Sequence, residues 1–171
     1  MIISLANLTT LSRLAIIPFL IYAILNEKYI ISGILTGYAI FSDYIDGIIA
    51  RANKDVTKHG ELLDPAVDKI FTISVLVAFV EKQVISTYVV FLIVLREMII
   101  TWVRSVLVNK GIVLPASYLG KIKTTFQMIG IFLLTINFNF YGVIFLWISI
   151  FFAYVSAIDY FRIFYREKAW I

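Results

Sequence analysis

Four aspartates between residues 43 and 68 carry the clearest chemical signal in the sequence. Asp43 and Asp46 are three residues apart, Asp64 and Asp68 are four apart, and both pairs stand in apolar surroundings. Residues three or four apart lie on one face of a helix, so the members of each pair point the same way. A polar link joins the two segments. We therefore expect two helices of a hairpin to aim four carboxylates at one point.

Carboxylates in such apolar surroundings require compensating positive charge. One aspartate in a membrane helix costs roughly 2.5 to 3.5 kcal/mol, so four carry a penalty of about 10 kcal/mol before they repel one another. Two divalent cations would balance the four charges, and hard carboxylate oxygens favour Mg²⁺, with Mn²⁺ as the alternative. Two metal ions are the usual clamp for displacement at phosphorus. The acids therefore predict metal-assisted phosphoryl chemistry.

Small residues and an arginine accompany the acids. Gly47 and Ala50 follow Asp43 and Asp46 on the same helical stripe, where they leave room for a ligand to approach the backbone. Arg51 offers a planar fork for phosphate oxygens. Gly60 would let a flat base lie close to the chain.

The composition predicts that membrane helices position these residues. Of the 171 residues, 61% are hydrophobic and 15% charged, and the mean hydropathy is +0.95, far outside the range of soluble domains. Apolar runs long enough to cross a bilayer recur along the chain. We expect an all-α bundle of six transmembrane helices that forms a single domain over residues 1–171. The expected spans are Leu11–Leu25, Tyr29–Arg51, Glu61–Val80, Val84–Leu107, Leu119–Asn137 and Tyr141–Phe164.

The basic residues predict the orientation of the bundle. With six spans, thirteen of the fifteen lysines and arginines fall on the side of the termini, and only Lys28 and Lys82 fall opposite. Nine against two remain when Arg13, Lys69, Arg96 and Arg104, which lie inside the spans, are left out. We expect a multi-pass protein of the plasma membrane with its termini and active site facing the cytoplasm, and with its first apolar run retained. The net charge of +4 then reflects membrane orientation and not binding to nucleic acid.

The residue types also exclude several kinds of site. The chain has no cysteine, so disulfides and thiolate metal sites are excluded. His59 is the single histidine and cannot build a histidine-rich zinc site. Any metal must be held mainly by oxygen.

At the acidic stretch the chain resembles the CDP-alcohol phosphatidyltransferases. Their signature D-x-x-D-G-x-x-A-R-x8-G-x3-D-x3-D is matched at every fixed position, namely Asp43, Asp46, Gly47, Ala50, Arg51, Gly60, Asp64 and Asp68. The resemblance implies a homodimeric membrane fold of six helices, in which the four aspartates hold two metal ions that grip the diphosphate of a CDP-lipid. It implies that Asp68 is the general base. The residues it implies as contacts of the CDP-lipid are Asn7, Thr10, Gly47, Ala50, Arg51 and Gly60.

Other segments resemble the bacterial phosphatidylglycerophosphate synthases within that family. They are residues 7–10 with Arg13 and Pro18, residues 63–65, Asp68-Lys69, Arg96-Glu97 with Arg104, and residues 120–125 with Gln127. Ala6 and Leu95 depart from that subgroup, which usually has proline and alanine there. This resemblance implies that the C1 hydroxyl of glycerol 3-phosphate attacks the β-phosphorus of CDP-diacylglycerol and releases CMP.

An acceptor that carries a phosphate needs its own cationic pocket. The candidates lie in the cytoplasmic half of the fourth and fifth expected spans and are Arg96, Arg104, Lys121 and Lys123. Arg96 is the most telling, because a charge deep in a span needs a partner. The alternatives are that Arg96 pairs with Glu97 or the acid cluster, and that the lysines are interfacial anchors.

Two other functions compete with this interpretation. The signature describes only the CDP-lipid half of the reaction, so inositol phosphate, serine or another alcohol remains open as the acceptor. A divalent-cation transporter would use the acids as an ion path. However, such a path needs a route to both faces, and the acids gather at one end of two helices.

Overall fold

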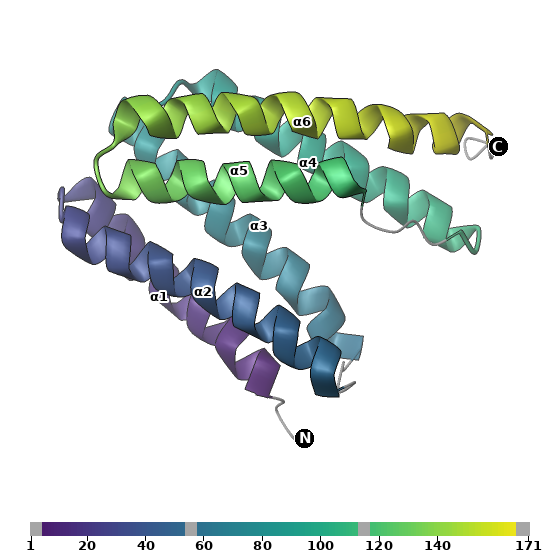
Figure 1. Cartoon of the computed structure of the whole chain (residues 1–171), viewed down its shortest axis with the longest axis horizontal. Coiled ribbons are helices and arrows are strands. Elements are labelled where there is room, and N and C mark those ends of the chain that lie inside the picture. Colours follow the sequence, from purple (N-terminus) through teal and green to yellow (C-terminus); the bar gives the residue numbers. More distant parts are fainter. Residues whose placement is uncertain (1–4, 54–57, 113–116, 167–171) are drawn as a thin grey trace. The chain divides into compact units, whose positions relative to one another are not determined.

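The computed structural model describes residues 5–53, 58–112 and 117–166, and the side chains of residues 9–45, 65–112 and 117–166. Within these ranges the chain forms six α-helices and no strand (Figure 1). They are α1 (Leu5–Leu25), α2 (Tyr29–Asn53), α3 (Lys58–Glu81), α4 (Thr87–Asn109), α5 (Tyr118–Thr135) and α6 (Asn139–Arg166). The prediction of an all-α fold with six helices is confirmed.

Three helices end in the same way, at short polar links. Glu27, Gln83 and Asn137 follow α1, α3 and α5 and adopt positive φ angles of 58°, 58° and 68°. The amide of the next residue then reaches back to the last turn, as where Lys28 N donates to the Ala23 carbonyl at 2.8 Å. This left-handed cap satisfies carbonyls that the end of a helix leaves without partners.

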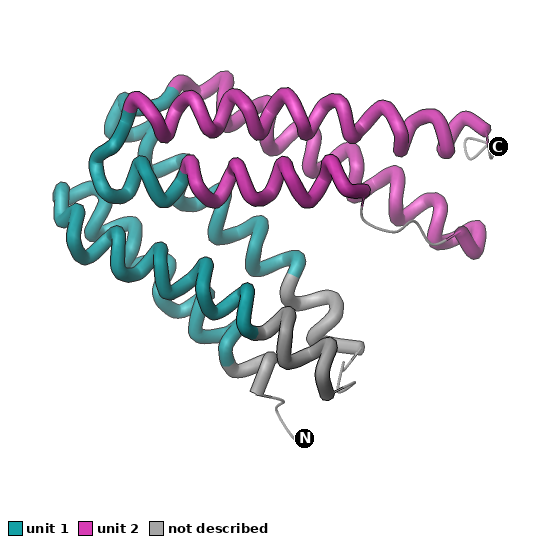
Figure 2. Tube along the Cα trace, viewed as in Figure 1, with its two compact units in different colours: residues 1–85, 131–139 teal, residues 86–130, 140–171 magenta. Residues whose placement is uncertain are grey.

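The chain divides into two compact units, each built from two stretches of sequence (Figure 2). Unit 1 contains Met1–Ile85 and Ile131–Asn139, and therefore holds α1, α2, α3 and the end of α5. Unit 2 contains Ser86–Gly130 and Phe140–Ile171, and therefore holds α4, the first part of α5 and most of α6.

In unit 1, α1 packs against both α2 and α3. Leu20 of α1 and Leu76 of α3 are fully buried in the apolar core. On α2, the hydroxyl of Ser32 donates to the Thr135 carbonyl at 2.8 Å. A Cβ atom at Gly33 would lie 2.7 Å from Cγ2 of Ile136, so only glycine fits there without a shift.

In unit 2, α4 and α6 share an apolar core that includes Val103, Leu107 and Phe164. The first part of α5 approaches α6 closely, because a Cβ atom at Gly130 would lie 3.1 Å from the Gly142 carbonyl oxygen. Close packing therefore places side chains of α4, α5 and α6 within reach of one another.

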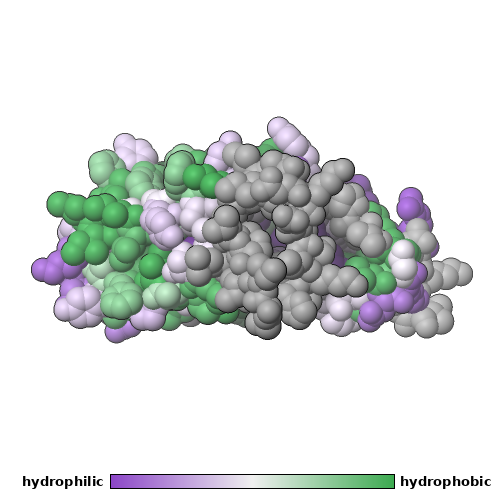
Figure 3. Space-filling model, turned by 90° about the horizontal axis from the view of Figure 1, so that it is seen from below, coloured by the Kyte–Doolittle hydropathy of each residue, from purple (hydrophilic) through white to green (hydrophobic). Residues whose placement is uncertain are grey.

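Among the described residues, α6 has the length and apolar character to cross a membrane. Shorter apolar stretches cover Thr9–Leu25 and Tyr29–Ile45. Many large apolar side chains are exposed, and Figure 3 shows broad apolar areas on the described surface of one face. A membrane span is thus supported for α6 by length and composition, and six spans stay a prediction.

Candidate active site

Two of the predicted metal-binding carboxylates meet at one arginine in unit 1. Nη1 of Arg13, on α1, donates to Oδ1 of Asp43 on α2 at 2.8 Å and to Oδ1 of Asp68 on α3 at 2.5 Å. The two carboxylate oxygens therefore lie within two hydrogen-bond lengths of each other. The Arg13 side chain is only 3% exposed, whereas those of Asp43 and Asp68 are 48% and 37% exposed. Both carboxylates are thus accessible to a ligand.

The position of Arg13 follows from the packing of α1 between its two neighbours. Thr10 lies one turn before Arg13, is almost fully buried, and accepts a long hydrogen bond of 3.5 Å from Arg13 Nη2. The family resemblance predicts that Thr10 contacts a CDP-lipid. The structure places its hydroxyl beside the guanidinium that joins Asp43 and Asp68.

Asp46 and Asp64 lie outside the residues whose side chains are described, as do Asn7, Gly47, Ala50, Arg51 and Gly60. In the part of the chain with described side chains, no group of three or more metal-ligating residues is close enough to hold an ion. The convergence of Asp43 and Asp68 nevertheless fits a divalent cation, because a divalent cation prefers hard oxygen donors. Here two carboxylate oxygens already face one positive group, the Arg13 guanidinium. The metal site of four aspartates stays a prediction.

A second charged group lies in unit 2, where Glu97 contacts two of the predicted acceptor-binding cations. Oε1 of Glu97 accepts from Arg96 Nη1 at 2.9 Å and from Lys123 Nζ at 2.6 Å. Arg96 also donates to the Ala153 carbonyl at 3.1 Å and to the Ser156 hydroxyl at 2.8 Å. The side chains of Arg96, Glu97 and Lys123 are 8%, 18% and 9% exposed. We call these three residues the Glu97 group.

The other two predicted acceptor-binding cations lie apart from the Glu97 group. Arg104, two turns after Arg96 on α4, donates to the Tyr160 hydroxyl at 2.5 Å. The same hydroxyl accepts from the backbone amide of Ser117 at 3.2 Å. Lys121 is exposed, because a residue two positions before the buried Lys123 lies on the other side of the helix.

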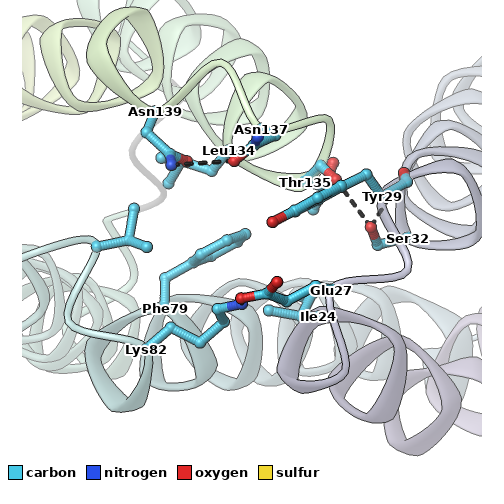
Figure 4. Close-up of a pocket in the computed structure, with 11 residues that line it drawn as sticks. Ile24, Glu27, Tyr29, Ser32, Phe79, Lys82, Leu134, Thr135, Asn137 and Asn139 are labelled. Atoms are coloured by element: carbon cyan, nitrogen blue, oxygen red, sulfur yellow. Dashed lines mark hydrogen bonds and ion pairs between the residues drawn. The ribbon is translucent and has the colours of Figure 1, made fainter.

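A cavity of about 170 Å³ lies at the other end of unit 1 (Figure 4). Four of its polar side chains form two pairs, in which Lys82 Nζ donates to Glu27 Oε1 at 2.6 Å and Asn139 donates to Asn137 at 3.2 Å. Lys82 follows α3 fourteen residues after Asp68, or about 21 Å along a helix. The cavity is therefore separate from the acid pair.

Comparison with known proteins identifies the family of the chain. The family model described as CDP-alcohol phosphatidyltransferase matches residues 3–155, a range that contains all four aspartates. The chain belongs to the CDP-alcohol phosphatidyltransferase family. The resemblance seen in the sequence is confirmed, and the protein is an enzyme of this family.

Relatives of this phosphatidyltransferase cover nearly its whole length. One from Bacillus subtilis (strain 168) is 33% identical, over 92% of this chain and 93% of its own. One from Wigglesworthia glossinidia brevipalpis is 32% identical, over 92% and 93%, and one from Aquifex aeolicus (strain VF5) is 30% identical, over 94% and 98%. All three are named CDP-diacylglycerol–glycerol-3-phosphate 3-phosphatidyltransferase.

Three residues that make contacts in this phosphatidyltransferase, Arg13, Glu97 and Tyr160, are given no function by the sequence. Arg13 is noted there as part of a resemblance, and Glu97 as part of a resemblance and as one alternative partner of Arg96. A charge inside an apolar helix is the signal that could have singled out both residues. Tyr160 has no such signal, because tyrosine is common at membrane interfaces and its partner Arg104 is distant in sequence.

Proposed function

We propose that this phosphatidyltransferase transfers the phosphatidyl group of CDP-diacylglycerol to glycerol 3-phosphate, giving phosphatidylglycerophosphate and CMP. The observation that carries this proposal is the set of relatives named for this reaction, which match along nearly the full chain. The convergence of Asp43 and Asp68 from two helices supports it.

The donor half of the site is formed by the acidic stretch. Asp43, Asp46, Asp64 and Asp68 would hold two divalent ions, Mg²⁺ or alternatively Mn²⁺. When bound, they would neutralise negative charge on the diphosphate and on the departing phosphate oxygen. The proposed contacts of the CDP-lipid are Asn7, Thr10, Gly47, Ala50, Arg51 and Gly60.

Asp68 is the general base of the proposed reaction. Its carboxylate accepts the proton of the C1 hydroxyl of glycerol 3-phosphate as that oxygen attacks the β-phosphorus. The bond from the β-phosphorus to the bridging oxygen breaks, and CMP leaves with that oxygen. Arg13 orients the carboxylate, because it already binds Oδ1 of Asp68 at 2.5 Å while the side chain stays 37% exposed.

The acceptor phosphate is bound by cations of unit 2, for which we propose Arg96, Arg104, Lys121 and Lys123. Within the Glu97 group two positive side chains share one carboxylate, so the group retains a net positive charge. Arg104 adds a second cation that Tyr160 holds in place. These charges suit an acceptor with a phosphate better than serine, which has none.

We further propose that the enzyme is a homodimer in the plasma membrane, with six spans and with its termini and active site in the cytoplasm. The apolar length of α6 supports insertion into a bilayer. Exposed side chains such as Ile30, at 80%, and Phe140, at 73%, also favour a lipid environment.

The acceptor is tested by supplying each alcohol separately. Purified protein in detergent micelles with Mg²⁺ and CDP-diacylglycerol is incubated with labelled glycerol 3-phosphate, inositol phosphate or serine. We expect CMP and labelled lipid to form only in the reaction that contains glycerol 3-phosphate. Labelled lipid formed only from another alcohol would overturn the proposed acceptor.

A further inference from the structure

Gln127, on α5, is a buried amide with an unused acceptor. Its side chain is 4% exposed, and its Oε1 atom has no hydrogen-bond partner among the residues that the structure describes. A buried carbonyl oxygen without a donor is unfavourable, so its position calls for a donor from outside the described residues. The catalytic proposal above gives Gln127 no role.

Gln127 lies beside the cations proposed to bind the acceptor. It follows Lys123 by four residues, so the two side chains share one stripe of α5, and both are buried. Lys123 Nζ in turn contacts Oε1 of Glu97 at 2.6 Å. The amide is therefore about one helical turn, or roughly 6 Å along the axis, from a residue of the Glu97 group.

The two kinds of group match the two ends of a phosphorylated alcohol. Lysine and arginine only donate hydrogen bonds, which suits phosphate oxygens, whereas the Gln127 carbonyl oxygen only accepts, which suits a hydroxyl. In glycerol 3-phosphate the C1 hydroxyl gives up its proton in the reaction. The C2 hydroxyl keeps its proton and stands on the carbon next to the one that bears the phosphate.

We propose that Gln127 is a specificity-determining residue that accepts a hydrogen bond from the C2 hydroxyl of the acceptor. This inference rests on the proposed function, because it requires glycerol 3-phosphate as the substrate. It assigns phosphate binding to the cations and recognition of the alcohol to the neighbouring amide.

The experiment compares two acceptors that differ only at C2. Glycerol 3-phosphate carries the C2 hydroxyl, and 3-hydroxypropyl phosphate lacks it but keeps the phosphate and the reactive hydroxyl. We expect the full-length enzyme to prefer glycerol 3-phosphate by about tenfold or more in kcat/KM. In Gln127→Met, kcat/KM for glycerol 3-phosphate should fall by about the same factor while that for 3-hydroxypropyl phosphate stays unchanged.

Two further variants separate hydrogen bonding from packing. Gln127→Glu keeps an acceptor oxygen but adds a negative charge near the phosphate, so KM should rise for both acceptors while the preference persists. Ser149→Ala is the matched control, because Ser149 is fully buried on α6 and its hydroxyl donates within its own helix, to the Leu146 carbonyl at 2.8 Å. We expect this control to keep the preference of the wild type.

The outcomes distinguish this inference from the proposed function. An active wild type without preference for glycerol 3-phosphate, or an equal loss with both acceptors in Gln127→Met, would overturn the role of Gln127 alone. Loss of the preference in Gln127→Glu would also overturn it, even if Gln127→Met failed to fold. A wild type that uses neither phosphate but does use another alcohol would overturn the proposed function as well.

Discussion

Replacement of Glu97 by glutamine tests whether one carboxylate holds two cations of unit 2 in place. Glu97 Oε1 accepts hydrogen bonds from Arg96 and Lys123 at 2.9 and 2.6 Å, and its side chain is only 18% exposed. A hydrogen bond to a charged group contributes about 1.5 to 3 kcal/mol. Glutamine keeps one acceptor but removes the charge between two cations. We therefore expect Glu97→Gln to lower the free energy of unfolding by about 2 to 4 kcal/mol.

The measurement is unfolding of the detergent-solubilised protein by SDS, followed by tryptophan fluorescence. Asp159→Asn is a matched control, because Oδ1 of Asp159 lies 3.7 Å from Arg162 Nη1 and both side chains are mostly exposed. An exposed pair of this kind contributes about 0 to 1 kcal/mol. Adding Lys123→Met to Glu97→Gln should recover part of the loss, because one of the two unbalanced charges is then removed.

The reasoning about the Glu97 group is refuted if Glu97→Gln unfolds at the same SDS concentration as Asp159→Asn. Strictly additive effects of Glu97→Gln and Lys123→Met would also contradict it, because side chains that share a hydrogen bond should be coupled.

Two other predictions concern unit 1. Gly33→Ala should lower the free energy of unfolding by about 1 kcal/mol, because the new Cβ would lie 2.7 Å from Ile136. The control is Gly37→Ala, whose new Cβ would have its nearest neighbour at 3.7 Å. In the same SDS titration this control should be neutral or stabilising. The hydrogen bond and the positive charge of Lys82 lower the pKa of Glu27 from its ordinary 4.5. The unfolded chain then binds more protons than the folded chain just below pH 4.5, so stability should fall as the pH drops through the lowered pKa. The stability difference between wild type and Glu27→Gln should vanish under acid conditions, and a difference independent of pH would contradict this.

Much of the fold follows from local patterns in the sequence. Apolar runs predict the six helices, and the polar links at Glu27, Gln83 and Asn137 correspond to the left-handed caps that end α1, α3 and α5. The observed helix boundaries differ from the expected ones where polarity is a poor guide to helix ends. Helix α1 begins at Leu5, before the expected span from Leu11, because helical hydrogen bonding continues beyond the apolar run.

The contacts between helices could not be predicted in the same way. Helical spacing tells which residues share a face of one helix, but not which other helix that face meets. Arg13 and Asp68 are 55 positions apart in sequence, and Lys123 and Glu97 are 26 apart. Among these charges, the sequence identifies Asp68 and Lys123 as candidates but does not single out their partners Arg13 and Glu97. Only the packing of α1 against α2 and α3, and of α4 with α5, shows which of them meet.

We propose that metal ions held by Asp43, Asp46, Asp64 and Asp68 are needed for transfer from CDP-diacylglycerol. The most direct measurement is CMP release by the purified enzyme with glycerol 3-phosphate, before and after exhaustive chelation. We expect CMP release to stop on chelation and to resume when Mg²⁺ or Mn²⁺ is added. In folded Asp→Asn variants at any of the four positions, no metal should restore it. Undiminished CMP release from the chelated enzyme would contradict this proposal.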